Sequence, residues 1–174
     1  MESAKSFIKV YNISPEAAED FEYDYSTDGC EPCSEIVTLL VPNHNDWGEL
    51  AWGIEFDHYE YNPHNQAIHF VLNTKWDSPV EWLRNASSGT HYFNNKLITM
   101  ATIQKDETCV TGVAVMDGEV LQKKNIWDMD PGDVSKHYDD EESDYDVDEL
   151  DNKIWDSIGQ FLLVCEKFYL GDSQ

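Results

Sequence analysis

The residues that could support chemistry in this sequence are carboxylates, and they are concentrated near its C-terminal end. Residues 128–151 contain twelve Asp and Glu residues and one lysine, Lys136. A run of this kind can bind calcium, begin a helix, form a solvated linker, or present negative charge to a basic partner. These four interpretations make different demands on the spacing of the residues.

The spacing does not fit an EF-hand calcium loop that starts at the beginning of the run. Gly132 falls at the fifth position, where an oxygen ligand is needed, and Asp139 stands at the twelfth in place of a bidentate Glu. The positive end of a helix would suit Asp146, Asp148 and Glu149. Weak calcium binding and an idle, solvated linker stay open, but helix capping accounts for only two or three of the twelve carboxylates.

A surface that imitates nucleic acid needs a row of carboxylates, and the run can form one in two ways. In an extended chain, Asp144, Asp146 and Asp148 would lie about 6.6 Å apart on one face, near two of the roughly 3.4 Å axial steps between phosphates. In a helix, Asp140, Asp144 and Asp148 would line one face. The predicted partner-binding residues are Asp139, Asp140, Glu141, Glu142, Asp144, Asp146, Asp148 and Glu149.

Other candidates for chemistry are sparse. Cys30 and Cys33 form a CxxC pair, which His44 or His58 could complete as a zinc site in space, although no second ligand pair accompanies it in sequence. We prefer the interpretation that Cys30 and Cys33 are two free thiols in a loop. The six histidines lack a metalloprotease spacing, and no P-loop, nucleophile elbow or dinucleotide fingerprint is present. We therefore expect no metal, no cofactor and no enzymatic activity.

The overall charge points to the class of partner. Eleven basic residues stand against 35 acidic ones, which gives a formal net charge of −24 over 174 residues. Nucleic acid and anionic membranes are unlikely ligands, because both are bound through Lys and Arg. A basic, nucleic-acid-binding protein is the expected partner. Acidic residues near the N-terminus could extend the surface: Glu16, Glu19, Asp20, Glu22, Asp24 and Asp28.

The expected compartment is the cytoplasm of a host cell. The N-terminal residues do not combine a basic segment with an apolar one, as a secretory signal would, and no apolar run reaches membrane-spanning length. We accordingly expect the four cysteines to be free thiols.

The caps, turns and hydrophobic periodicity along the chain predict the elements that position these residues, and together they predict an α+β fold. Ser14-Pro15 begins a short helix that continues to about Phe21, and Ser78-Pro79-Val80-Glu81 is a capping box that begins another. Apolar residues at helical spacing predict an amphipathic helix over about 148–170. Strands are predicted over 6–13, 35–41, 50–59, 67–73, 97–104, 108–116 and 119–123, with a tight turn at Asp117-Gly118.

The middle of the chain resembles the YubB-type ferredoxin-like domain family of phage and plasmid proteins. The likeness covers Ile68 to Val120. It includes a strand leading to Thr74-Lys75-Trp76, a proline-led helix with Trp82 and Leu83, an acidic turn at Asp106-Glu107 and a strand bearing Gly112. Upstream, Trp47-Gly48 and Trp52-Gly53 resemble the family's tryptophan-glycine motif. The resemblance implies a mobile-element origin and a ferredoxin-like βαββαβ core, and it carries over no catalytic residue.

Together these observations predict three parts. Residues 1–127 would form a ferredoxin-like antiparallel sheet with helices packed on one face, residues 128–149 an acidic segment, and residues 150–174 a helix packed on the core. The expected function is a phage- or plasmid-encoded inhibitor that mimics nucleic acid in the binding groove of a host defence protein or nuclease. The alternatives are a ferredoxin-like adaptor or assembly module, and a small metal-dependent enzyme.

Overall fold

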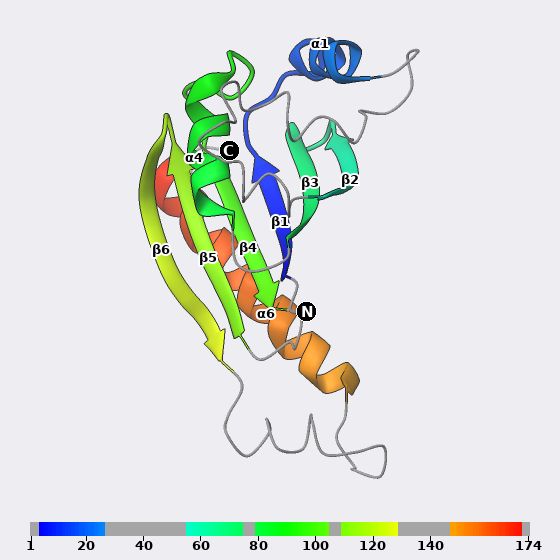
Figure 1. The fold of residues 1–174 in the computed structure, drawn as a ribbon. Helices are drawn as coiled ribbons and strands as arrows, with labels where there is room; N and C mark the ends of the chain where they lie inside the picture. The colour runs from blue at the N-terminus through cyan, green and yellow to red at the C-terminus, as the bar shows by residue number, and fades with distance from the viewer. Residues whose placement is uncertain (1–3, 27–54, 75–78, 105–108, 129–146, 172–174) are drawn as a thin grey trace.

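The protein folds around one antiparallel sheet. The computed structural model describes residues 4–26, 55–74, 79–104, 109–128 and 147–171. The sheet has six strands in the order β2-β3-β1-β4-β5-β6 (Figure 1). The strands are β1 (Ala4–Val10), β2 (Glu55–Asn62), β3 (Ala67–Thr74), β4 (Ile98–Gln104), β5 (Cys109–Met116) and β6 (Glu119–Asp128). The predicted α+β class is confirmed, and the predicted strand over 35–41 lies outside the described residues.

Helices cover both faces of this sheet: the two helices within residues 1–127 pack on one face, as predicted for that part, and the C-terminal helix packs on the other. Within the described residues, α1 (Pro15–Tyr25) and α4 (Val80–Gly89) belong to one side, and α6 (Val147–Cys165) crosses the other (Figure 1). The physical reason lies in the central strands. In β4, Met100 faces the core under α4 while its neighbour Ala101 packs against α6. A strand that is apolar on both faces requires cover on both.

The core beneath α1 and α4 is largely aromatic. Phe21 of α1 is fully buried, and its ring lies between 4.7 and 5.9 Å from five other aromatic rings. Those rings belong to Tyr25, Tyr59, Phe70, Tyr92 and Phe93. Aromatic pairs at this separation add to the free energy gained by burial. The alternation predicted for β3, with Ile68, Phe70 and Leu72 on one face, is confirmed and contributes to the same core.

The predicted C-terminal helix is confirmed, although its apolar face differs in detail. Ile154, Ile158, Phe161 and Cys165 are buried against the sheet, at the spacing of an amphipathic helix. Trp155 and Phe168, two other apolar residues of the predicted segment, are exposed. One reason is that α6 continues into a π-helical turn, η2 (Glu166–Leu170), which changes the angular position of Phe168.

Two other element boundaries were predicted inexactly. Strand β2 (Glu55–Asn62) runs past the predicted end at 59, and residues 50–54 of that prediction lie outside the described residues. Helix α4 begins at Val80, and Pro79 is its N-cap rather than its first helical residue. Ser78, the expected cap, lies outside the described residues.

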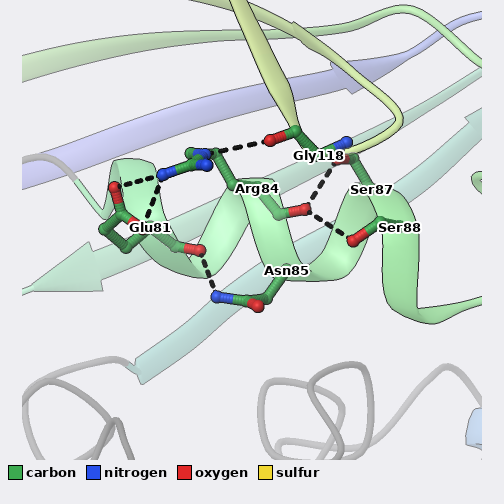
Figure 2. A network of polar contacts seen from close by, with 6 residues as sticks. All are labelled: Glu81, Arg84, Asn85, Ser87, Ser88 and Gly118. Atoms are coloured by element: carbon green, nitrogen blue, oxygen red, sulfur yellow. Dashed lines mark hydrogen bonds and ion pairs between the residues drawn. The ribbon is translucent and has the colours of Figure 1, made fainter.

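The tight turn between β5 and β6 was predicted correctly, and a polar network attaches it to α4. Asp117 and Gly118 both have positive φ, 50° and 82°, as a type I′ hairpin turn requires. Figure 2 shows the network. The Gly118 N–H donates to Ser87 Oγ at 2.8 Å, and Ser87 Oγ donates to the Arg84 carbonyl at 2.8 Å. Arg84 Nε donates to the Gly118 carbonyl at 2.9 Å. Both backbone groups of Gly118 are thereby satisfied by α4.

None of the helices in the described ranges combines the length and the apolar composition that crossing a membrane requires.

Candidate partner-binding surface

Most of the predicted partner-binding carboxylates lie outside the described residues. These are Asp139, Asp140, Glu141, Glu142, Asp144 and Asp146. The backbone of Asp148 and Glu149 is described, and both belong to the first turn of α6, which begins at Val147. A position in the first turn of a helix is what the capping interpretation made from the sequence requires.

The start of α6 corrects one of the two row geometries. Asp148 is helical, so an extended row that alternates through Asp144, Asp146 and Asp148 does not form as predicted. In a helix the side chains two apart in sequence point in different directions, since each residue rotates by about 100°. The helical row through Asp140, Asp144 and Asp148 stays a prediction, because its first two members lie outside the described residues.

A second acidic surface is fully described, and it lies on α1. Ser14 caps the helix by accepting a hydrogen bond from the Ala17 N–H at 3.1 Å, and Pro15 occupies the first turn. Ala18 and Phe21 are buried on the inner side of the helix. Because residues three and four apart share a helix face, the burial of Ala18 and Phe21 directs the acidic positions outward.

The outer face of α1 carries carboxylates around an exposed tyrosine. We call this set the α1 acidic face; its members are all exposed and are Glu16, Glu19, Asp20, Tyr23 and Asp24. Tyr23 has 81% of its surface exposed. No Lys or Arg occurs in α1, and within the described ranges no ion pair involves its carboxylates. The α1 acidic face therefore presents uncompensated negative charge.

This arrangement works against the stability of the helix. Glu16 and Glu19 are three residues apart, and Glu16 and Asp20, like Asp20 and Asp24, are four apart. Like-charged pairs at these spacings destabilise a helix by about 0.2–0.5 kcal/mol each. The N-cap, the dipole and the burial of Phe21 offset that cost. Net charge of this kind keeps a protein soluble, and it is also available to a basic partner.

Two carboxylates of α1, Glu22 beside this face and Asp24 within it, form hydrogen bonds inside the structure. Glu22 Oε1 accepts a hydrogen bond from the Tyr59 hydroxyl at 3.1 Å, and the Asp24 carboxylate accepts one from the Tyr92 hydroxyl. Burial raises the pKa of the Tyr59 phenol, and the neighbouring Glu22 raises it further, so this hydroxyl stays a donor. These two bonds attach α1 to β2 and to the residues after α4. Glu16, Glu19 and Asp20 stay available to a partner.

Among the residues that the structure describes, the remaining candidates from the sequence form no cluster of metal ligands. Cys30, Cys33 and His44 lie outside the described residues, and no group of three potential ligands occurs among the residues that are described. His58 Nε2 lies 3.7 Å from Glu60 on the exposed edge strand. Burial lowers the pKa of His69, and nearby Lys9 lowers it further, so its imidazole is mainly neutral at pH 7. Asp57 lies at a register shift of β2, between Phe56 and His58, and its carboxylate lies 3.4 Å from Lys5 Nζ.

The sequence prediction did not include Tyr23. The predicted helix ended near Phe21, which left Tyr23 in a loop. The observed helix runs to Tyr25 and places Tyr23 on the same face as Glu16, Glu19 and Asp20. The signal was present in the spacing, because Glu16, Asp20 and Asp24 continue the helical period past Phe21 on the face opposite the buried residues.

Comparison with known proteins adds no relative: the chain matches no protein-family model, no curated protein and no solved structure.

Proposed function

We propose that this protein is a non-enzymatic, phage- or plasmid-encoded inhibitor that imitates nucleic acid. It binds a basic groove of a host defence protein or nuclease and thereby excludes DNA or RNA from that groove. The net charge of −24 and the uncompensated carboxylates of the α1 acidic face support this proposal. The predicted acidic run, Asp139 to Glu149, would add a second part of the same binding surface.

The observation that carries the proposal is the geometry of the α1 acidic face. Glu16 and Asp20 lie about 6 Å apart along the helix axis. That distance is near two of the roughly 3.4 Å axial steps between successive phosphates. Tyr23 offers a rigid aromatic surface among them, and aromatic residues are common anchors at protein interfaces. A groove built for phosphates and bases would contact both kinds of side chain.

Mechanistically, carboxylates take the place of phosphates opposite Lys and Arg. Complementary charge steers association and raises the rate of encounter, and added salt screens that attraction over about 8–10 Å. Inhibition should therefore weaken as salt increases. The inhibitor needs no chemistry of its own, since occupying the groove is sufficient.

The experiment uses the chain as bait in an extract of the natural host, at about 50 mM and about 500 mM salt. We expect a basic nucleic-acid-binding protein to be captured at the lower salt and released at the higher. The captured protein is then tested for loss of DNA or RNA binding when the bait is added. Capture of proteins without nucleic-acid-binding activity, or capture that ignores salt, would contradict the proposal.

Two matched triple variants test the α1 acidic face. The variant Glu16→Gln/Glu19→Gln/Asp20→Asn removes three charges from it. The control, Glu60→Gln/Glu119→Gln/Asp156→Asn, removes three exposed charges elsewhere. We expect the first to weaken inhibition at least about tenfold and the control about twofold or less, because near charges dominate at physiological ionic strength. Equal losses would assign the effect to total charge alone.

A third variant replaces the acidic residues of 139–149 with Asn or Gln. We expect it to lose inhibition while keeping the far-ultraviolet circular dichroism of the folded protein. A variant that still inhibits fully would remove this run from the binding surface.

We also propose that the core is ferredoxin-like. The described elements from β1 to β4 follow one another as β-α-β-β-α-β, the element order of that motif, and their four strands are contiguous in the sheet. On this proposal β5, β6 and α6 are additions to one edge and one face. This order also supports the proposed kinship with YubB-type proteins of phages and plasmids.

The second candidate function is an adaptor or assembly module, and the exposed side of α6 and η2 favours it. Trp155, Leu163, Val164 and Phe168 are all exposed, and Phe168 has 77% of its surface open to solvent. Binding through these side chains would depend little on salt. The same bait experiment separates the two functions, because capture retained at about 500 mM salt and lost in Phe168→Ser supports the adaptor.

A further inference from the structure

A pocket of about 400 Å³ lies at the C-terminal end of α6, away from the α1 acidic face. Its lining comes from β1 and the residue that follows it, from the turn between β2 and β3, and from the end of α6 with η2. The side chains that matter to the argument are Lys9, Tyr11, Leu163, Glu166, Lys167 and Leu170. A volume of this size falls in the range of small-molecule sites.

An ionic cluster forms the inner wall of this pocket. Lys9 Nζ lies 3.1 Å from Glu166 Oε1, and the Tyr11 hydroxyl donates to the same oxygen at 2.8 Å. The Lys9 and Glu166 side chains have only 17% and 32% of their surface exposed. Lys9 Nζ also lies 4.7 Å from the centre of the Tyr11 ring. Partly burying an ion pair costs desolvation energy, and replacement by apolar residues is often neutral or stabilising. Stability alone therefore gives little reason to keep the cluster.

The outer wall is a π-helical turn. Residues Glu166–Leu170 form η2, and Gly171 ends it with a φ of 79°, a conformation that favours glycine. The wider turn places Glu166, Lys167 and Leu170 around one opening. Single π-helical turns of this kind occur frequently at functional sites.

The lining of the pocket has a charged part and an apolar part, which would contact different parts of a ligand. Lys9 and Lys167 contribute two positive charges and Glu166 one negative charge, so the local sum is +1 in a chain whose total is −24. At physiological ionic strength charges beyond about 8 Å are largely screened, so the distant acidic residues of the chain act only weakly on this pocket. Leu163 and Leu170 supply the apolar part of the wall.

We propose that this pocket binds a small organic carboxylate with a short apolar tail. The carboxylate lies between the ammonium groups of Lys9 and Lys167, and the tail packs on Leu163 and Leu170. This binding does not depend on the function proposed for the α1 acidic face, which uses other residues.

The test is a titration of the isotopically labelled full chain, followed by heteronuclear NMR. Three ligands share one tail and differ in their head group: hexanoate, hexanol and hexylamine. We expect hexanoate to shift the amides of Lys9, Tyr11 and residues 163–171 saturably, with a Kd of about 1–10 mM as suits so small a ligand. Hexanol and hexylamine should bind more weakly.

Two charge variants of exposed lysines complete the design. Lys167→Gln should weaken hexanoate binding about two- to fivefold, the factor expected for one exposed ion pair. Lys123→Gln is the control, because Lys123 pairs with Val113, whose side chain belongs to the core on the opposite face of the sheet. Its affinity for hexanoate should not change.

Three results would overturn the proposal. The first is no saturable shift with hexanoate up to about 100 mM, which is about ten times the upper end of the expected Kd. The second is equal or tighter binding of hexanol or hexylamine, which would make the site apolar or cation-binding. The third is an equal loss of affinity in the Lys167 and Lys123 variants.

Discussion

Replacing Gly112 with alanine should loosen the attachment of α6 to the sheet. Gly112 lies in β5 beneath the ring of Phe161, which is 4% exposed. A Cβ at position 112 would lie 2.7 Å from both Cε1 and Cζ of that ring and 2.9 Å from Cδ1. Carbon atoms pack best at about 3.5–4.0 Å, so the overlap approaches 1 Å. Because the ring of Phe161 is enclosed and cannot move aside alone, α6 must shift away from β5.

The expected magnitude is the difference between two effects. Overpacking a core by one carbon costs about 1–3 kcal/mol. Replacing a glycine within a strand by alanine stabilises the fold by about 0.5–1 kcal/mol, because alanine loses less backbone entropy on folding. The net loss in the free energy of unfolding should be about 1–2 kcal/mol, which lowers Tm by about 2–8 °C in a chain of this size. Urea denaturation followed by tryptophan fluorescence measures it directly.

The matched control is Gly159→Ala. A Cβ there meets nothing within 4 Å, and the residue lies in the middle of α6. This variant should gain up to about 1 kcal/mol, since alanine favours a helix and glycine does not. The double variant Gly112→Ala/Phe161→Leu should lose less than the sum of its single variants, because the smaller side chain makes room for the methyl group. Additive losses, or a Gly112→Ala variant as stable as the native protein, would refute this account of the contact.

Three further predictions concern single side chains. Ser87→Ala should cost about 1–3 kcal/mol, because it leaves the Gly118 N–H without its acceptor, whereas the exposed Ser88→Ala should change stability by less than about 0.5 kcal/mol in the same urea experiment. Ser14→Ala should cost about 1 kcal/mol through loss of the N-cap, measured by thermal denaturation, and an unchanged Tm would contradict the capping bond. Burial raises the pKa of the Tyr11 and Tyr59 phenols above their unfolded value near 10. Their contribution to the free energy of unfolding is therefore complete below about pH 10 and is lost as the pH rises beyond it. The Tyr11→Phe/Tyr59→Phe variant should therefore lose less stability between about pH 9 and pH 11 than the native chain, and parallel pH profiles would reject this assignment.

Local patterns in the sequence were sufficient wherever neighbouring residues determine the conformation. Ser14-Pro15 predicted the start of α1, because a hydroxyl cap and a fixed proline φ act within one turn. Asp117-Gly118 predicted the hairpin turn, because both positions require positive φ. The alternation in residues 67–73 predicted β3 and its buried face.

Boundaries that depend on packing were predicted less well. Helix α1 continues to Tyr25 because the rings of Phe21 and Tyr25 pack together, 4.7 Å apart between centres, within the aromatic core. That continuation adds Tyr23 to the α1 acidic face. The acidic run remains a prediction from the sequence, since its residues from Asp139 to Asp146 lie outside the described part of the chain.

By itself the sequence determined the acidity of the protein, its α+β class and most of its elements, because composition and short-range periodicity encode these properties directly. Only the tertiary structure decided which elements became neighbours. It placed α6 on the face opposite α4, set the ring of Phe161 over Gly112, and brought Lys9 together with Glu166 across 157 positions of sequence. Such contacts follow from strand register and helix packing over the whole chain, and no local pattern records them.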